Sequence, residues 1–186
     1  LFGPEGRWIA ANTDVQGFIH SLSRMGLRAV RGDVWILGAG ATACSALAGL
    51  AELGVTDAVV VARRPGSAFD VQNVAARCGI TLDVLPWSEV HGIVGAELAV
   101  SCVPAGAADE LAPAFQGTAP RGLWFDVVYS PWPTLAASAW EAAGGRSVGG
   151  LELLVEQAAE QVRLMTGVAA PIDVMRAAGE LALRLR

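Results

Sequence analysis

The chain of 186 residues contains no lysine, so arginine supplies all 13 of its basic Lys and Arg side chains. Any chemistry that needs a lysine with a tuned pKa must therefore take that lysine from elsewhere. Cysteine is also scarce. Cys44, Cys78 and Cys102 are odd in number and form no Cys-x-x-Cys pair, which argues against a disulfide scaffold and a zinc site. We expect reduced, buried thiols, as in a cytoplasmic protein.

Three further signals are missing. No uninterrupted apolar run reaches about 18 residues, so we expect no membrane span. The chain shows no signal-peptide pattern. The net charge of −5 argues against a nucleic-acid surface. The two histidines, His20 and His91, have no His, Cys or acidic partner at ligand spacing, so we expect no metal site.

Hydrophobic residues make up 53% of the chain and occur in short segments separated by glycine. This pattern predicts alternating strands and helices, and hence a Rossmann-like α/β fold: a doubly wound parallel six-stranded sheet with helices on both faces. The expected strands are 34–37, 58–62, 81–85, 98–102, 122–127 and 146–148. The expected helices are 15–25, 42–53, 67–78, 87–94, 107–114, 135–143, 151–166 and 172–185. Residues 1–11 read as the end of a hairpin, with a returning strand at 7–11.

A nucleotide-binding motif follows the first of these strands. After the glycine turn comes a helix whose first N–H groups and dipole favour an anion, and the small Ala43 allows close packing on the strand. The alternative is a glycine loop that only turns the chain. The residues expected to bind a diphosphate are Gly38, Ala39, Gly40, Ala41 and Thr42.

The tip of the second strand distinguishes between two cofactors. An NAD site places an Asp or Glu about 20 residues beyond the glycines, where it binds the ribose 2′-hydroxyl. Here the tip reads Ala62-Arg63-Arg64, without an acid. Guanidinium groups bind phosphate, whereas a carboxylate would repel it. We therefore predict that Arg63 and Arg64 bind the 2′-phosphate of NADP(H).

The long helix after Gly150 carries a glutamine of interest. Its expected apolar stripe comprises Leu151, Leu154, Val155, Ala158 and Val162. Gln157 lies off that stripe, near the start of the helix. Periodicity alone favours an ordinary solvated glutamine, and a ligand contact is the alternative.

Four motifs occur in a specific order and separation. They are Asn12-Thr13-Asp14-x-x-Gly17-Phe18, Gly38-Ala-Gly-Ala-Thr-Ala43, Asp126-Val-Val-Tyr129-x-Pro131-x-x-Thr134 and Gly149-Gly150-Leu-x-Leu-Leu-x-x-Gln157-Ala158. With these motifs, nearly the whole chain resembles the shikimate dehydrogenase family. The resemblance implies an N-terminal substrate domain, a C-terminal NADP domain, and reduction of 3-dehydroshikimate to shikimate in aromatic biosynthesis.

The resemblance also implies roles for particular residues. Asp14 matches the family's aspartate that hydrogen-bonds the substrate hydroxyls and works beside a catalytic lysine, although a helix N-cap is its structural alternative. Gln157 and Tyr129 match substrate contacts. Val103 and Val127 match the lining of the nicotinamide and its ribose. Gly150 matches the glycine that packs on the nicotinamide, and Arg63 and Arg64 fall in the 2′-phosphate segment.

Three positions depart from the family pattern. Ala62 replaces the usual Asn, Ser101-Cys102-Val103-Pro104 is a loose version of Asn-Thr-Thr-Pro, and Leu153 stands where Met is common. In the family, the catalytic lysine and a substrate-binding asparagine precede the first residue here, so we expect most of the substrate lobe to lie outside this chain. This stretch alone is then expected to be inactive.

The expected domain boundaries follow from the same resemblance. Residues 1–14 would end the substrate domain, 15–171 would form the NADP-binding Rossmann domain, and 172–186 would be a helix packing toward the substrate domain. The alternatives are a quinate/shikimate dehydrogenase and a non-catalytic NADP-binding module. A folate or glutamyl-tRNA reductase relative is disfavoured by Asp14, Tyr129 and Gln157 together. The expected partner is a small molecule, shikimate or 3-dehydroshikimate, and the assembly could be a homodimer.

Overall fold

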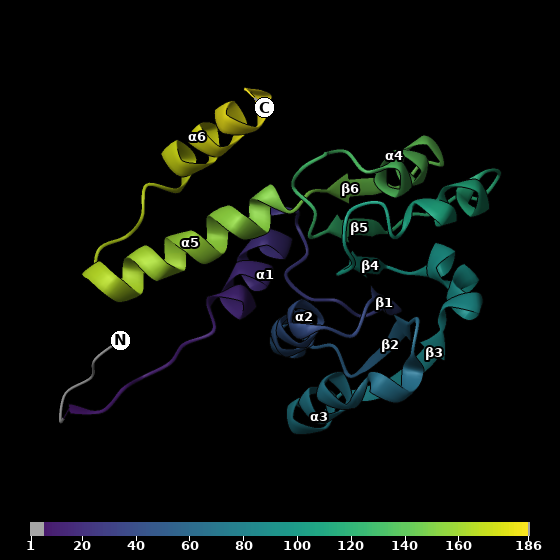
Figure 1. Cartoon of the computed structure of the whole chain (residues 1–186), viewed down its shortest axis with the longest axis horizontal. Coiled ribbons are helices and arrows are strands. Elements are labelled where there is room, and N and C mark those ends of the chain that lie inside the picture. The colour runs from purple at the N-terminus through teal and green to yellow at the C-terminus, as the bar shows by residue number, and fades with distance from the viewer. Residues whose placement is uncertain (1–5, 186) are drawn as a thin grey trace.

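The six strands form one parallel sheet in the order β3-β2-β1-β4-β5-β6 (Figure 1). The computed structural model describes residues 6–185. The strands are β1 Val34–Leu37, β2 Asp57–Ala62, β3 Thr81–Pro86, β4 Leu98–Ser101, β5 Leu123–Asp126 and β6 Arg146–Val148. The strand order reverses between β1 and β4. The prediction of a doubly wound, six-stranded parallel sheet is therefore confirmed.

Helices cover both faces of this sheet. The α-helices are α1 Thr13–Arg24, α2 Ala41–Glu52, α3 Phe69–Cys78, α4 Leu135–Ala142, α5 Leu151–Thr166 and α6 Ile172–Arg184; the 3-10 helices are η2 Pro65–Ser67, η3 Trp87–Gly95 and η4 Asp109–Phe115. One core cluster joins the sheet to α1, α2 and α3. The other joins it to η3, η4 and α4. Every residue of β4 and β5 is buried, as parallel strands covered on both faces require.

Two of the segments that were predicted as helices are 3-10 helices. Residues 87–94 contain Gly92, and Gly95 follows them, so this segment has a weak helix propensity. Within η4, Pro113 lacks the N–H that an α-helix interior requires. The expected strand at 7–11 is also wrong, because within the described residues of that segment only Trp8 has bridge geometry and all five are exposed. Residues 1–5, which would complete that hairpin, lie outside the described part.

Helices α1, α5 and α6 form a group beside the sheet, which we call the helical group. Figure 1 shows α1 between α2 and α5, with α6 on the far side of α5. Glycines allow α1 to pack closely on both neighbours. A Cβ at Gly17 would lie 3.0 Å from Gln157 Cβ on α5, and one at Gly49 of α2 would lie 3.1 Å from the Val15 carbonyl oxygen. None of the described helices is long and apolar enough to cross a membrane.

Candidate functional site

Four loops meet at the carboxyl edge of the sheet, where backbone hydrogen bonds tie each of them to a neighbouring strand or loop. The pairs are Gly38 N–H to the Val61 carbonyl (2.8 Å), Cys102 N–H to the Leu37 carbonyl (2.9 Å), Val127 N–H to the Ser101 carbonyl (3.0 Å) and Gly150 N–H to the Val128 carbonyl (2.9 Å). Their centre is the switch point between β1 and β4, where doubly wound sheets bind ligands. The loops that follow β1, β4, β5 and β6 therefore lie together.

The two glycines of the β1–α2 loop are required for different reasons. Gly38 has φ +97°, and a Cβ there would lie 3.1 Å from the Cys102 carbonyl oxygen, so both backbone and packing demand glycine. Gly40 has φ −89°, and a Cβ there would meet nothing within 4 Å. Neither backbone conformation nor packing within the protein explains glycine at position 40. A ligand that closely approaches the backbone does explain it.

Helix α2 begins at this loop without a capping side chain. Its N-cap residue is Gly40, and its first turn contains no acidic residue. The N–H groups of Ala41 and Thr42 therefore face outward with the positive end of the helix dipole. This amino end fits the diphosphate of a dinucleotide.

The basic tip lies at the same edge. β2 ends at the buried Ala62, and the exposed Arg63 and Arg64 follow directly. The hydrogen bond from Gly38 N–H to the Val61 carbonyl joins the end of β2 to the glycine loop. The structure therefore brings the predicted diphosphate loop and the two arginines into one region.

Val103, Val127 and Gly150 lie on the other side of the switch point, beyond β4 and β5. A Cβ at Gly38 would lie 3.2 Å from Val103 Cγ1, so the glycine loop packs on Val103. Gly150 is buried, and a Cβ there would collide with the Val127 carbonyl group. Val103 and Val127 are half-buried, with apolar surface still open. The loops that follow β4, β5 and β6 and carry these three predicted residues are called the wall below.

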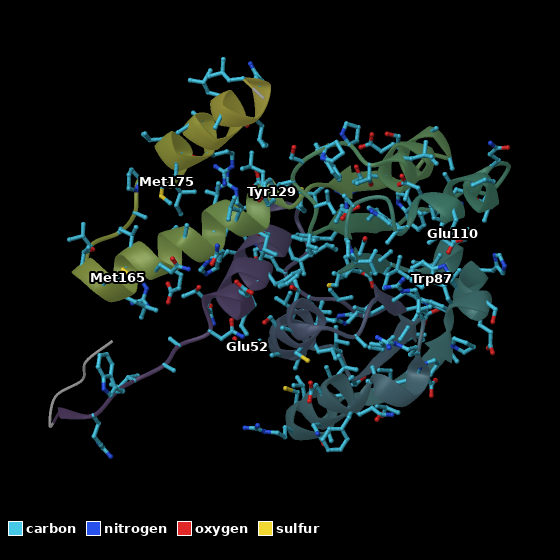
Figure 2. All side chains as sticks on the ribbon, viewed as in Figure 1. Glu52, Trp87, Glu110, Tyr129, Met165 and Met175 are labelled. Carbon is cyan, nitrogen blue, oxygen red and sulfur yellow. The ribbon has the colours of Figure 1, made fainter. Side chains whose placement is uncertain are left out.

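Tyr129 continues that wall toward α5. Figure 2 shows it beside the amino-terminal end of this helix, and 42% of its surface is exposed. It borders a cleft of about 850 Å³ that lies between the 129–133 loop, the start of α5 and the end of α6.

The residues of the motif at the start of α1 make different contacts. Asn12, not Asp14, caps the helix: Asn12 Oδ1 accepts a hydrogen bond from the Asp14 N–H (3.1 Å), and Asn12 Nδ2 donates to Ser45 Oγ on α2 (2.9 Å). The N-cap alternative for Asp14 is therefore wrong. Asp14 lies half-buried in the first turn. Within residues 6–185, no hydrogen bond or ion pair engages its carboxylate, which leaves it available to a ligand.

Gln157 of α5 is linked to the same motif. Its carboxamide oxygen accepts hydrogen bonds from Thr13 Oγ1 (3.3 Å) and Gln161 Nε2 (2.8 Å), and Gln161 Nε2 also donates to Thr13 Oγ1 (3.2 Å). This triangle orients the amide NH₂ of Gln157 away from Thr13 and Gln161. Sequence analysis missed Gln161, although its i,i+4 spacing from Gln157 was a usable signal.

The predicted apolar stripe of α5 is wrong. Leu154 is 41% exposed, whereas the buried residues of this helix are Leu153, Val155, Glu156 and Ala159. The helix packs against α1 on one side and α6 on another, so no single stripe describes it. Gln157 consequently lies on the side that faces α1, not on a free surface.

Comparisons with known proteins identify the family. A family model described as the shikimate 5′-dehydrogenase C-terminal domain matches residues 150–178. Shikimate dehydrogenase (NADP(+)) of Oleidesulfovibrio alaskensis is 36% identical over 183 residues, covering 95% of this chain and 63% of that protein. The crystal structure of Mycobacterium tuberculosis shikimate dehydrogenase has a TM-score of 0.83 at 35% identity, covering 97% of this chain and 66% of that one. The chain belongs to the shikimate dehydrogenase family.

A further solved member of the shikimate dehydrogenase family comes from Thermus thermophilus, in complex with NADP(H) and shikimate. It matches with a TM-score of 0.76 and 28% identity, covering 96% of this chain and 66% of the other. The present chain spans 63% and 64% of two curated shikimate dehydrogenases. It therefore corresponds to a part of such an enzyme that includes the C-terminal domain.

Asp126 is the first residue of the third family motif, and it is only 1% exposed. It accepts hydrogen bonds from Val128 N–H (3.0 Å), Thr134 Oγ1 (3.0 Å) and Trp124 Nε1 (3.3 Å). Burial raises the pKa of the Asp126 carboxyl above its ordinary value, and these hydrogen bonds oppose that shift. Sequence analysis treated Asp126 only as a motif position.

Cys102 is not a candidate nucleophile in this arrangement. Burial, followed by the neighbouring Asp126 charge, raises the pKa of its thiol well above the ordinary value, so the reactive thiolate is suppressed. In the described residues no group of three or more His, Cys, Asp or Glu side chains is placed to hold a metal ion.

Proposed function

We propose that this chain provides the NADP(H) site and one wall of the substrate site of a shikimate dehydrogenase. The reaction is reversible reduction of 3-dehydroshikimate to shikimate. The observation that carries the proposal is the uncapped amino end of α2 at Gly40, next to the basic Arg63 and Arg64. An anion-binding helix end and two neighbouring guanidinium groups match a diphosphate and an additional 2′-phosphate.

The residues divide into those that would bind the two parts of the cofactor and those that would bind the substrate. Gly38, Ala39, Gly40, Ala41 and Thr42 would bind the diphosphate, while Val103, Val127 and Gly150 would form the nicotinamide wall. Asp14, Gln157 and Tyr129 would orient the hydroxyl groups of the substrate. Bound by these residues, the cofactor would supply a hydride to the ring ketone. The ketone oxygen needs a proton, which an ionised Asp14 cannot donate, so we infer an acid outside these residues, consistent with the family's lysine.

Titration calorimetry tests the cofactor proposal. We expect tighter binding of NADPH than of NADH, and we expect Arg63→Ala to weaken NADPH about 10-fold or more while leaving NADH nearly unchanged, because only NADPH offers the 2′-phosphate. The matched control is Arg121→Ala, since Arg121 is exposed and precedes β5 at the opposite edge of the sheet. Equal affinities for NADPH and NADH, or an equal loss of both in the variant, would contradict the proposal.

A steady-state assay of the intact protein tests the substrate. Shikimate and quinate should be compared with NADP⁺, and we expect shikimate to have the larger kcat/KM. A preference for quinate would indicate the quinate/shikimate dehydrogenase alternative. NADP(H) binding without turnover of either compound would indicate a non-catalytic module. For residues 1–186 alone we expect negligible turnover, because they contain no lysine.

The proposed domain boundaries remain 1–14, 15–171 and 172–186. The packing of α1 on both α2 and α5 supports counting these helices with the sheet. All three cysteines lack a disulfide, which supports a reducing compartment such as the cytoplasm. We also propose a homodimer, and light scattering that gives a monomer mass would refute it.

A further inference from the structure

A buried carboxylate sits at the carboxyl end of β5, and the reaction described above does not use it. Asp126 Oδ1 accepts from Val128 N–H, and Oδ2 accepts from Trp124 Nε1 and Thr134 Oγ1. The Val128 and Trp124 N–H groups can only donate, so each carboxylate oxygen faces a donor. This pattern is that of an ionised carboxylate. Among residues 6–185, no arginine or histidine forms an ion pair with it.

The carboxylate lies at the end of a strand that one half of a bound dinucleotide would cross. The basic tip of β2 fixes the adenosine half, and the diphosphate binds at the start of α2, next to β1. A dinucleotide that crosses the switch point must then extend its nicotinamide half over β4 and β5. Asp126 is the last residue of β5 and directly precedes Val127. It also lies close enough to the Cys102 thiol, which directly follows β4, to raise the pKa of that thiol.

Asp126 also holds the backbone of that wall. It binds the Val128 N–H, and the Val128 carbonyl in turn accepts the Gly150 N–H (2.9 Å). Its Thr134 contact ties the far end of the 127–133 loop, where Thr134 Oγ1 accepts the Ala137 N–H as the cap of α4 (3.2 Å). The carboxylate is thus fixed in position and shielded from water, so its field is weakly screened.

We propose that Asp126 provides a fixed negative charge beneath the nicotinamide half-site and selectively favours the oxidised cofactor. The oxidised nicotinamide ring carries a positive charge and the reduced ring carries none. A buried carboxylate therefore attracts the positively charged ring of NADP⁺ but not the uncharged ring of NADPH. Asp126 is a positioning residue that does not touch the reacting atoms, and this inference rests on the proposed function.

A purely structural role makes a different prediction. If Asp126 only held the 127–133 loop, removing its charge would weaken NADP⁺ and NADPH by the same factor. The ratio of the two dissociation constants therefore separates the two roles. Thr134→Val is the matched control, because it removes one hydrogen bond to the carboxylate but leaves the charge in place.

The test is calorimetric titration of the intact protein with NADP⁺ and NADPH, after thermal melting has shown which variants fold. Asp126→Asn keeps the side-chain shape and an acceptor for Val128 N–H, and Asp126→Ser is a second variant without the charge. We expect each folded variant to lose about threefold to tenfold more affinity for NADP⁺ than for NADPH. Thr134→Val should leave that ratio unchanged.

The outcomes separate the two proposals. Equal losses for NADP⁺ and NADPH in the charge-free variants would overturn the inference while leaving the proposed function intact. A ratio shifted equally by Thr134→Val would also overturn it, because loop displacement alone would then explain the effect. If the unaltered protein bound neither cofactor, the proposed function would fail instead.

Discussion

The α4 face of the sheet and the helical group are stabilised in different ways. On the α4 face of the sheet, Phe115, Trp124 and Trp140 form an aromatic cluster with ring centroids 5.2–5.7 Å apart. All three rings are at most 1% exposed. The helical group instead buries a charge: Glu156 is 2% exposed and contacts Arg176 of α6 (3.2 Å). Apolar packing dominates on that face of the sheet, whereas ion pairs connect α6 to α5.

Helix α6 depends on these charges. It contains no buried residue, although Figure 2 shows Met175 on the side of α6 that faces α5. Arg176 forms a fork with both oxygens of Glu152 (2.9 and 3.1 Å) and binds Glu156 as well. The neighbouring Arg24 of α1 lies 3.7 Å from Glu156. We therefore expect the sheet and the helices that cover it to unfold cooperatively, whereas α6 can detach on its own.

The largest expected effect comes from the aromatic cluster. Trp140→Ala should destabilise the protein by about 3–5 kcal/mol, because it empties a fully buried site and removes the hydrogen bond to the Gly122 carbonyl. Urea unfolding measures the loss. Leu135→Ala is the control on the same helix, since Leu135 is 58% exposed and should change stability by less than about 0.5 kcal/mol. Similar losses in both variants would contradict the picture of the cluster as core.

A smaller and more local effect is expected in the helical group. Arg176→Ala leaves Glu152 and Glu156 without their nearest cation, and should cost about 1–3 kcal/mol as α6 opens to hydrate these carboxylates. Hydrogen exchange should accelerate in α6 while β1, β4 and β5 stay protected. Arg184→Ala is the control, because its contact with Glu180 is exposed and 4.0 Å long. If exchange rose equally in the sheet, α6 would not be an independent unit.

Much of the sheet could be predicted because its signals are local. Apolar strands between glycine turns mark β1 and β2, and the glycine-rich loop predicts the start of α2 to within one residue. Gly38 and Gly40 could also be recognised as a pair. The different reasons for the two glycines could not be predicted. Gly38 contacts the Cys102 carbonyl, and these residues follow two different strands.

The helical group was harder to predict because its determinants are tertiary. The burial of Glu156 depends on Arg176, which lies on another helix, so periodicity placed the apolar stripe of α5 on the wrong residues. Asp126 was overlooked for a similar reason. Its donors come from β5, the following loop and α4, and no spacing rule connects them.

The smallest effect is expected at the seam between α1 and α5, and it is seen in substrate binding more than in stability. Gln161→Ala removes two exposed hydrogen bonds, to Gln157 and to Thr13. It should change stability by less than about 1 kcal/mol. Because the Gln157 carboxamide then keeps only its hydrogen bond from Thr13, we expect KM for shikimate in the intact protein to rise about twofold to fivefold with little change in kcat.

The control for this prediction lies on the same helix. Arg163→Ala breaks the exposed pair with Glu160 (2.6 Å) without touching Gln157, and KM should not change. NADP⁺ affinity should also be unaffected in both variants, because neither of them changes a residue that we assign to the cofactor. A Gln161→Ala protein with unaltered KM would mean that the Thr13 hydrogen bond and the packing against Gly17 are enough to orient Gln157.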